Sequence, residues 1–269
     1  MTQEVFDGFV ATEFTADGET RTVYSGGTGP AVIVIHEVPG LHPGVVDFAR
    51  RVVARGYHVR MPSLFGTPGK PMSFGYVVKS MAGGCISRDF ATWALDRTSP
   101  ITTWLRALAA DAHHTCGGPG VGAVGMCFTG GFALGMMLDD RMLAPVLSQP
   151  SMPFPIGKKR KAALGISDID LAVVERRAQE EGACVLGLRF TGDAVVPPAR
   201  FDTLRRVLGD RFLAVEINSS KGNPHGFSRS AHSVLTEHFV DEPGNPTHDA
   251  LERVLAFFDE RLRPNEARS

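Results

Sequence analysis

The stretch VGAVGMCFTGGFALGMML, residues 121–138, begins with a strand pattern and ends with a helix pattern, and Cys127 stands at the junction. A strand that turns sharply into a helix lifts its junction residue above the carboxyl edge of a sheet. Gly125 before the cysteine and Gly130 after it leave room for such a turn. A helix N-terminus and a neighbouring imidazole lower the pKa of a cysteine thiol, which is otherwise about 8.5. The pattern therefore predicts a nucleophile, and a buried unreactive cysteine is the alternative.

A nucleophile at such a strand-to-helix turn, called a nucleophile elbow, needs an imidazole as base and a carboxylate to orient it. Along the chain, the acidic residue comes after the nucleophile and the histidine comes after the acidic residue. Asp193 comes just after a predicted strand in LRFTGDAVVP, although a turn aspartate that caps its own backbone would look the same. His225 lies in the turn-forming loop NPHGFSR beyond the next predicted strand. We expect these two residues to complete the site. Rival histidines, in more helical or terminal surroundings, are His232, His238 and His248. The rival carboxylates Asp168 and Asp170 precede a predicted helix and are interpreted as its caps.

Glu37 is an unusual residue for its place in the sequence. It directly follows the apolar run from Ala31 to His36, which has the pattern of a fully buried strand. A carboxylate at the end of such a strand is costly unless it is paired or functional. We expect Glu37 to belong to the site, with a structural salt bridge as the alternative.

Short apolar runs alternate with segments of helical periodicity over most of the chain, which is the pattern of an α/β protein with a mostly parallel sheet. We expect residues 1–269 to form a single domain, with irregular excursions near residues 67–98 and 150–168. Strands are predicted at 31–36, 57–66, 121–126, 142–150, 183–193 and 211–218. Helices are predicted at 42–56, 99–113, 171–179, 198–208 and 248–263.

The composition excludes several classes of function. The 28 Lys and Arg residues balance 29 Asp and Glu residues, so attraction to nucleic acid or to an anionic membrane is not expected. No apolar run is long enough to span a membrane, and no leader peptide is evident, so we expect a cytoplasmic protein. The four cysteines lack the pairing of a disulfide framework or a zinc site, and no metal or cofactor is expected. The oligomeric state is left open.

Four motifs together resemble the dienelactone hydrolases, relatives within the α/β-hydrolase fold, which has helices on both faces of a twisted, mostly parallel sheet. They are HEVPGLHPGVVDFARRVVARGYHVRMPSLFG, GAVGMCFTGG, TGDAVVP and PHGF, and the likeness runs from about residue 30 to the last helix. The resemblance implies Cys127 as nucleophile, His225 as general base and acid, and Asp193 as the carboxylate that orients it. It also implies that Glu37 takes the thiol proton. The oxyanion donors would be the backbone N–H groups of Val38 and Phe128.

Relatives that open carboxylated lactones hold the substrate carboxylate with arginines, one of them four residues after the catalytic histidine. Arg229 stands at that spacing from His225, and Arg88 is a candidate for the second arginine, with Trp93 as a wall. Thr129 and Gly226 depart from the family pattern. We expect the protein to hydrolyse an activated ester or lactone that itself carries a carboxylate. The reaction is expected to pass through a thioester on Cys127. Alternatives are a general carboxylesterase or thioesterase and a non-catalytic ligand-binding relative.

Overall fold

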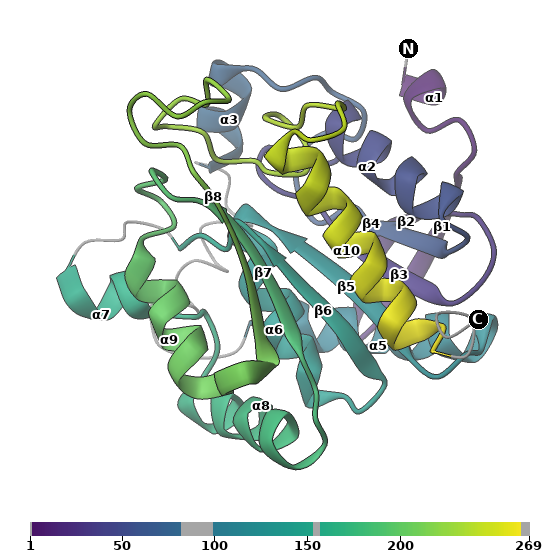
Figure 1. The fold of residues 1–269 in the computed structure, drawn as a ribbon. Coiled ribbons are helices and arrows are strands. Elements are labelled where there is room, and N and C mark those ends of the chain that lie inside the picture. Colours follow the sequence, from purple (N-terminus) through teal and green to yellow (C-terminus); the bar gives the residue numbers. More distant parts are fainter. Residues whose placement is uncertain (1, 82–98, 153–156, 265–269) are drawn as a thin grey trace.

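A computed structural model describes residues 2–81, 99–152 and 157–264 and contains one eight-stranded sheet of order β1-β2-β4-β3-β5-β6-β7-β8 (Figure 1). The six strands β3 to β8 run parallel, and β1 and β2 extend the sheet as an antiparallel edge. The strands are β1 Val10–Ala16, β2 Glu19–Gly26, β3 Ala31–Ile35, β4 His58–Pro62, β5 Val121–Met126, β6 Met142–Ser148, β7 Val185–Phe190 and β8 Phe212–Ile217.

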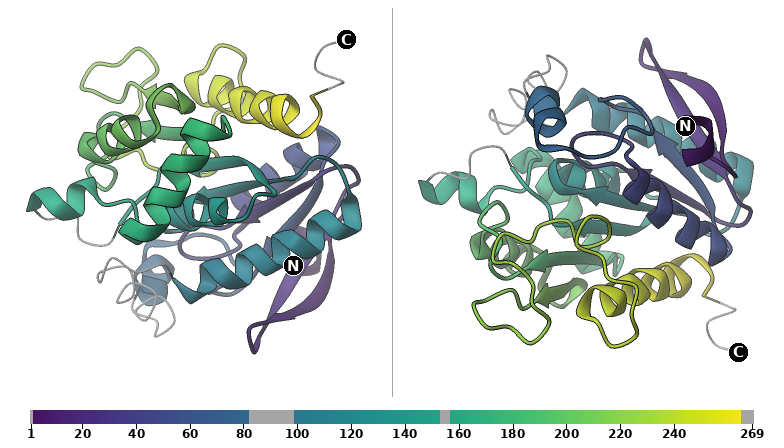
Figure 2. Two further views of the ribbon diagram at one scale, coloured as in Figure 1. Left: turned by 90° about the horizontal axis from the view of Figure 1, so that it is seen from below. Right: turned by 90° about the horizontal axis from the view of Figure 1, so that it is seen from above.

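The sheet is covered on both faces because the side chains of its central strands alternate between two apolar clusters. Ile33 and Ile35 of β3 face one cluster, and Val32 and Val34 face the other. Figure 2 shows α10 and α5 on opposite sides of the sheet. One layer contains α2 Pro43–Ala54 and α10 Pro246–Leu262. The other contains α5 Pro100–Cys116, α6 Gly130–Gly135, α8 Asp168–Glu180 and α9 Pro198–Leu208.

Helix boundaries follow local chemistry. Proline is the first residue of α2, α5, α9 and α10, where its missing N–H costs no intrahelical bond. The Ser99 hydroxyl accepts a hydrogen bond from Ile101 N at 3.3 Å and caps α5. Ser167, and neither Asp168 nor Asp170, is the N-cap of α8, and both aspartates lie in its first turn.

The hairpin of β1 and β2 is an element that the sequence analysis did not predict. Its turn at Asp17 and Gly18 has positive φ at both residues, 50° and 76°, which suits the twist of a tight hairpin. Short elements also occur at α1 Thr2–Val5, α3 Phe74–Met81 and α7 Gly157–Ala162 and in the 3₁₀ turns Cys127–Thr129, Met136–Leu138 and Gly209–Arg211. The helices α3 and α7 lie within the two expected excursions, whose residues 82–98 and 153–156 are outside the described part of the chain.

Within residues 2–81, 99–152 and 157–264, no helix combines the length and apolar character needed to cross a bilayer. The same residues contain no group of three or more His, Cys, Asp or Glu side chains arranged to hold a metal ion.

Candidate active site

Cys127 lies at a sharp turn between β5 and α6. Its φ is 54°, in the left-handed region that residues with a Cβ seldom adopt. A Cβ on Gly125 would come within 2.3 Å of the Thr129 carbonyl oxygen, and one on Gly130 within 2.7 Å of the Pro150 side chain. Glycine is therefore required on both sides of the turn, and the half-buried thiol stands at the carboxyl edge of the sheet.

Thr129, which departs from the family pattern, ties the turn to the neighbouring strand. Its hydroxyl accepts a hydrogen bond from Met126 N at 2.9 Å and lies 3.0 Å from the Ile35 carbonyl oxygen at the end of β3. The side chain is fully buried. A hydroxyl at this position therefore fixes the turn against β3, a contact that glycine could not make.

Asp193 and His232 form a hydrogen-bonded pair above the ends of β7 and β8. His232 Nδ1 lies 2.6 Å from Asp193 Oδ2, and the other carboxylate oxygen accepts a hydrogen bond from Val195 N at 2.8 Å. Asp193 is only 4% exposed. A buried carboxylate bonded in this way fixes the orientation of the imidazole and stabilises its protonated form.

The expected pairing of His225 with Asp193 is therefore corrected, because His232 takes that place. His225 lies at the exposed tip of the loop after β8, where Asn223 folds the loop back by bonding Phe227 N and Phe227 O. The chain then returns to the sheet, and the apolar side chains next to His232 are buried: Ala231, Val234 and Leu235. Their burial carries His232, and not His225, to the sheet edge.

His232 also interacts with the sulfur of Cys127. Burial by itself would lower the pKa of His232, but the charge of the Cys127 thiolate and hydrogen bonds to Asp193 and Cys127 raise that pKa well above its ordinary value. With Nδ1 on Asp193, the ring has Nε2 left for the sulfur. The structure thus brings together a thiol, an imidazole and a carboxylate in the arrangement of a nucleophilic triad.

Glu37 is buried at 1% exposure and receives hydrogen bonds from side chains of three different segments. His42 Nε2 lies 3.2 Å from Oε1, which also accepts from Thr236 Oγ1. Oε2 accepts from Ser233 Oγ at 2.6 Å and from Gln149 Nε2 at 3.1 Å. The carboxylate therefore joins the end of β3, the end of β6 and the loop that carries His232.

The electrostatics of Glu37 fit a charged, fixed side chain. Burial by itself would raise its pKa, but hydrogen bonds from His42, Ser233 and Thr236 and the charge of His42 outweigh it and lower the pKa below the ordinary value. The Cys127 sulfur is not among the hydrogen-bond partners found for Glu37 in the described residues. The contacts of Glu37 are therefore those of an anchor, and its expected role in taking the thiol proton stays a prediction.

Arg200 is a buried cation that the sequence analysis did not single out. It is 1% exposed, and its guanidinium donates to the backbone carbonyls of Ala163 (2.8 Å), Pro150 (2.8 Å), Val195 (3.2 Å) and Arg160 (3.1 Å). Burial lowers the pKa of Arg200 to about 10, and the nearby charges of Asp193 and Cys127 oppose that shift. Arg200 therefore ties together the backbone segments that surround the site. Its sequence context, the first turn of an ordinary helix, gives no signal for this role.

The expected oxyanion donors lie at the same edge of the sheet. β3 and β5 are neighbours with Ile35 opposite Gly125, so Val38 and Phe128 follow adjacent strand ends. Phe128 is buried and packs edge-on against Phe65 and Phe132. This placement is compatible with two converging backbone N–H groups, and their role stays a prediction.

The expected substrate-binding residues are Arg88, Trp93 and Arg229. Arg88 and Trp93 lie outside the described residues. Arg229 is exposed, and its assignment depended on a spacing of four residues from His225. The residue four positions after His232 is Thr236, whose hydroxyl is bonded to Glu37. The spacing argument for a carboxylate-binding arginine therefore does not hold for the histidine that the structure places at the site.

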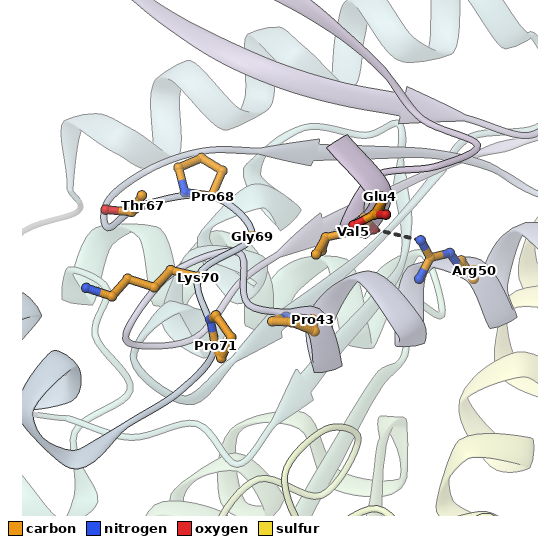
Figure 3. A pocket seen from close by; sticks show the side chains of 9 residues that line it. All are labelled: Glu4, Val5, Pro43, Arg50, Thr67, Pro68, Gly69, Lys70 and Pro71. Carbon is orange, nitrogen blue, oxygen red and sulfur yellow. Dashed lines mark hydrogen bonds between the residues drawn. The ribbon is translucent and has the colours of Figure 1, made fainter. Parts of the chain in front are cut away.

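A separate pocket of about 650 Å³ lies between α1, the start of α2 and residues 67–71 (Figure 3). Arg50 donates to the Val5 carbonyl at 2.6 Å on one side of it, and Lys70 projects from the other. Cys127, Asp193 and His232 do not line it. The pocket is thus distinct from the candidate active site.

Comparisons with known proteins agree with this architecture, whose sheet and strand-turn-helix nucleophile position define the α/β-hydrolase fold. The profile of the dienelactone hydrolase family matches residues 20–262. The chain therefore belongs to the dienelactone hydrolase family, a family of hydrolases.

Individual relatives are distant. A Salmonella typhi protein provisionally named carboxymethylenebutenolidase is 28% identical over 94 residues, which are 35% of this chain and 34% of that protein. An Escherichia coli K12 protein with the same provisional name is 26% identical over 116 residues, 40% of this chain and 42% of its own length. The matched segment thus spans between a third and a half of these curated relatives.

Solved structures agree in fold over nearly the whole chain. A Klebsiella pneumoniae protein provisionally named dienelactone hydrolase has a TM-score of 0.63 at 21% identity, covering 94% of this chain and 99% of its own. Est1E from Butyrivibrio proteoclasticus has a TM-score of 0.57 at 14% identity, covering 93% and 98%. At these identities the likeness establishes the fold alone.

Proposed function

We propose that the protein hydrolyses an activated ester or lactone through a thioester on Cys127, with His232 as general base and acid and Asp193 as its orienting carboxylate. One observation carries the proposal: the sulfur on the strained turn at φ 54° interacts with the imidazole whose Nδ1 is bonded to Asp193 at 2.6 Å. A structural cysteine needs no such partners.

In the first half of the proposed reaction, the Cys127 thiolate adds to the substrate carbonyl. The raised pKa of His232 favours the imidazolium, and this positive charge favours the ionised sulfur beside it. The carbonyl electron pair moves onto oxygen, where the backbone N–H groups of Val38 and Phe128 are proposed to stabilise it. As the carbon–oxygen bond breaks, the His232 proton neutralises the leaving alcohol, or the opened oxygen of a lactone. The acyl group remains on sulfur.

In the second half, His232 is neutral and accepts a proton from water as the water oxygen attacks the thioester carbon. The carbon–sulfur bond then breaks, the electron pair leaves with sulfur, and the acid product is released. The thiolate and imidazolium are restored. Thiolate is a good leaving group, so a lactone or ester whose alcohol is also stabilised as an anion suits this nucleophile best.

Glu37 is proposed to position the site. Its carboxylate already accepts four hydrogen bonds, so taking a thiol proton would break contacts that anchor it. Ser233, which it holds at 2.6 Å, directly follows His232 in the chain, and Val38 directly follows Glu37. One carboxylate therefore links the segment of the base to the segment of the expected oxyanion donor.

A general carboxylesterase or thioesterase is the second candidate. It is favoured by the exposure of Arg229 and by the loss of the spacing argument that made this arginine a carboxylate ligand. Rates with acidic lactones and with neutral aryl esters, each measured for wild type and Arg229→Ala, separate the two candidates.

The test of the proposal is turnover of activated esters and lactones by Cys127→Ala. Loss of hydrolysis with an unchanged circular dichroism spectrum and melting temperature is the expected result. Near-normal hydrolysis would overturn the proposed function. Absence of hydrolysis by the wild type, together with an inert Cys127, would instead favour a ligand-binding protein on a hydrolase scaffold.

A further inference from the structure

A second polar group, from the segment that follows β6, contacts the Cys127 sulfur. Ser151 Oγ lies 3.1 Å from Cys127 Sγ, and Ser151 N donates to the Cys127 carbonyl oxygen at 2.9 Å. Ser151 is 6% exposed. Two hydrogen bonds to one residue fix both the backbone and the side chain of Ser151 against the turn.

The segment that carries Ser151 is held firmly on both sides. Gln149 N donates to the Leu188 carbonyl at 2.7 Å, which attaches the segment to β7. The guanidinium of Arg200 donates to the Pro150 carbonyl at 2.8 Å. The hydroxyl therefore faces the sulfur because the backbone places it there, with little freedom to move away.

The direction of the contact follows from charge. A thiolate has no proton and can only accept hydrogen bonds, so the Ser151 hydroxyl must donate to it. Such a bond to an ionised acceptor is stronger than one between neutral groups. Once sulfur carries an acyl group it has lost its charge, and the same contact weakens.

We propose that Ser151 is a further catalytic residue, whose hydroxyl donates to the Cys127 thiolate in addition to His232. This inference rests on the proposed function of Cys127 as the nucleophile. Ser151 raises the fraction of ionised sulfur in the resting enzyme and stabilises the departing thiolate when the thioester is hydrolysed. It takes no proton and forms no covalent bond, so the proton balance between water, leaving group and His232 is unchanged.

The test is the rate of alkylation of Cys127 by iodoacetamide as a function of pH, located by peptide mass spectrometry, in wild type and Ser151→Ala. A hydrogen bond to a charged acceptor contributes about 1.5 kcal/mol, so we expect about tenfold slower alkylation of the variant on the acidic side of the profile. The two rates should converge at alkaline pH. Ser151→Thr, which keeps the hydroxyl, should react like wild type.

Ser230→Ala is the matched control, because Ser230 is an exposed serine bonded to Ser228. Melting temperatures check that the variants fold, and Ser151→Gly removes the same hydroxyl should alanine disturb the turn. Profiles of Ser151→Ala or Ser151→Gly that coincide with wild type at every pH would overturn the inference. If Cys127→Ala abolishes turnover in that case, the proposed function stands and only the role of Ser151 fails.

Discussion

His232 Nδ1 is hydrogen-bonded to Asp193 Oδ2 at 2.6 Å across 39 residues of sequence, and this pair selects one histidine from the nine in the chain. Replacing His232 by Gln removes the proposed base and acid, and we expect kcat/KM for an activated ester to fall by about 10²- to 10⁴-fold. His225→Gln is the matched control and should retain activity, since His225 is exposed at the tip of the loop after β8. The reverse pattern, with His225 essential and His232 dispensable, would contradict this assignment.

The charge of the Cys127 thiolate is the largest cause of the raised pKa of His232. Replacing Cys127 by Ala removes that charge, and we expect the pKa of His232 to move down toward its ordinary value of about 6.5. NMR titration of the histidine ring, with the signal assigned through His232→Gln, measures the change. An unchanged titration in Cys127→Ala would show that the sulfur and the imidazole are not coupled.

Glu37 satisfies donors from four side chains at the centre of the site. Glu37→Ala leaves these buried donors without an acceptor, and we expect the free energy of unfolding to fall by about 3 kcal/mol or more. Glu252→Ala, at an exposed position of α10, should change stability little. Urea denaturation of both variants gives the comparison. Equal effects would refute an anchoring role for Glu37.

The lowered pKa of Glu37 also predicts how stability depends on pH. Its ionised form stabilises the fold at pH values above the unfolded pKa of about 4.3, and this contribution is lost as the pH falls through the native pKa. Between about pH 5 and pH 3 the free energy of unfolding should therefore fall more steeply in wild type than in Glu37→Gln. Urea denaturation of both proteins across this pH range measures how the free energy of unfolding depends on pH. Equal slopes for wild type and Glu37→Gln would contradict the lowered pKa of Glu37.

Gly125 has no space for a Cβ, which would come within 2.3 Å of the Thr129 carbonyl oxygen. Gly125→Ala should cost about 2 kcal/mol or more and displace the thiol, so that activity also falls. Gly75→Ala, in α3, is the matched control because its Cβ would meet nothing within 4 Å. Thermal denaturation and ester hydrolysis are measured for both. A Gly125→Ala protein with wild-type stability and activity would contradict the tight-turn geometry.

Much of the fold could be predicted from the sequence, because buried parallel strands and proline-initiated helices have strong local patterns. The strand at Val121–Met126 and the helix at Pro198–Leu208 have the predicted bounds. The hairpin of β1 and β2 was not predicted. Its strands are largely exposed or half-buried, so they lack the apolar runs on which the other strand predictions were based, although Asp17-Gly18 is a recognisable turn signal.

The site was harder to predict, because its histidine is selected by tertiary packing. The PHGF motif directed the prediction to His225, whereas buried Ala231, Val234 and Leu235 return the chain to the core beside His232. The apolar pattern around His232 was the available signal. Ser151 and Arg200 act through contacts with residues distant in sequence, and no local pattern distinguishes them from ordinary loop and helix residues.

Mass spectrometry of the protein quenched during turnover of an activated ester tests the central claim most directly. We expect an acyl group on the peptide that contains Cys127, formed within the first turnover and lost as product appears, with none on Cys127→Ala. Steady hydrolysis with no acyl group on Cys127, or with the acyl group on another residue, would contradict it.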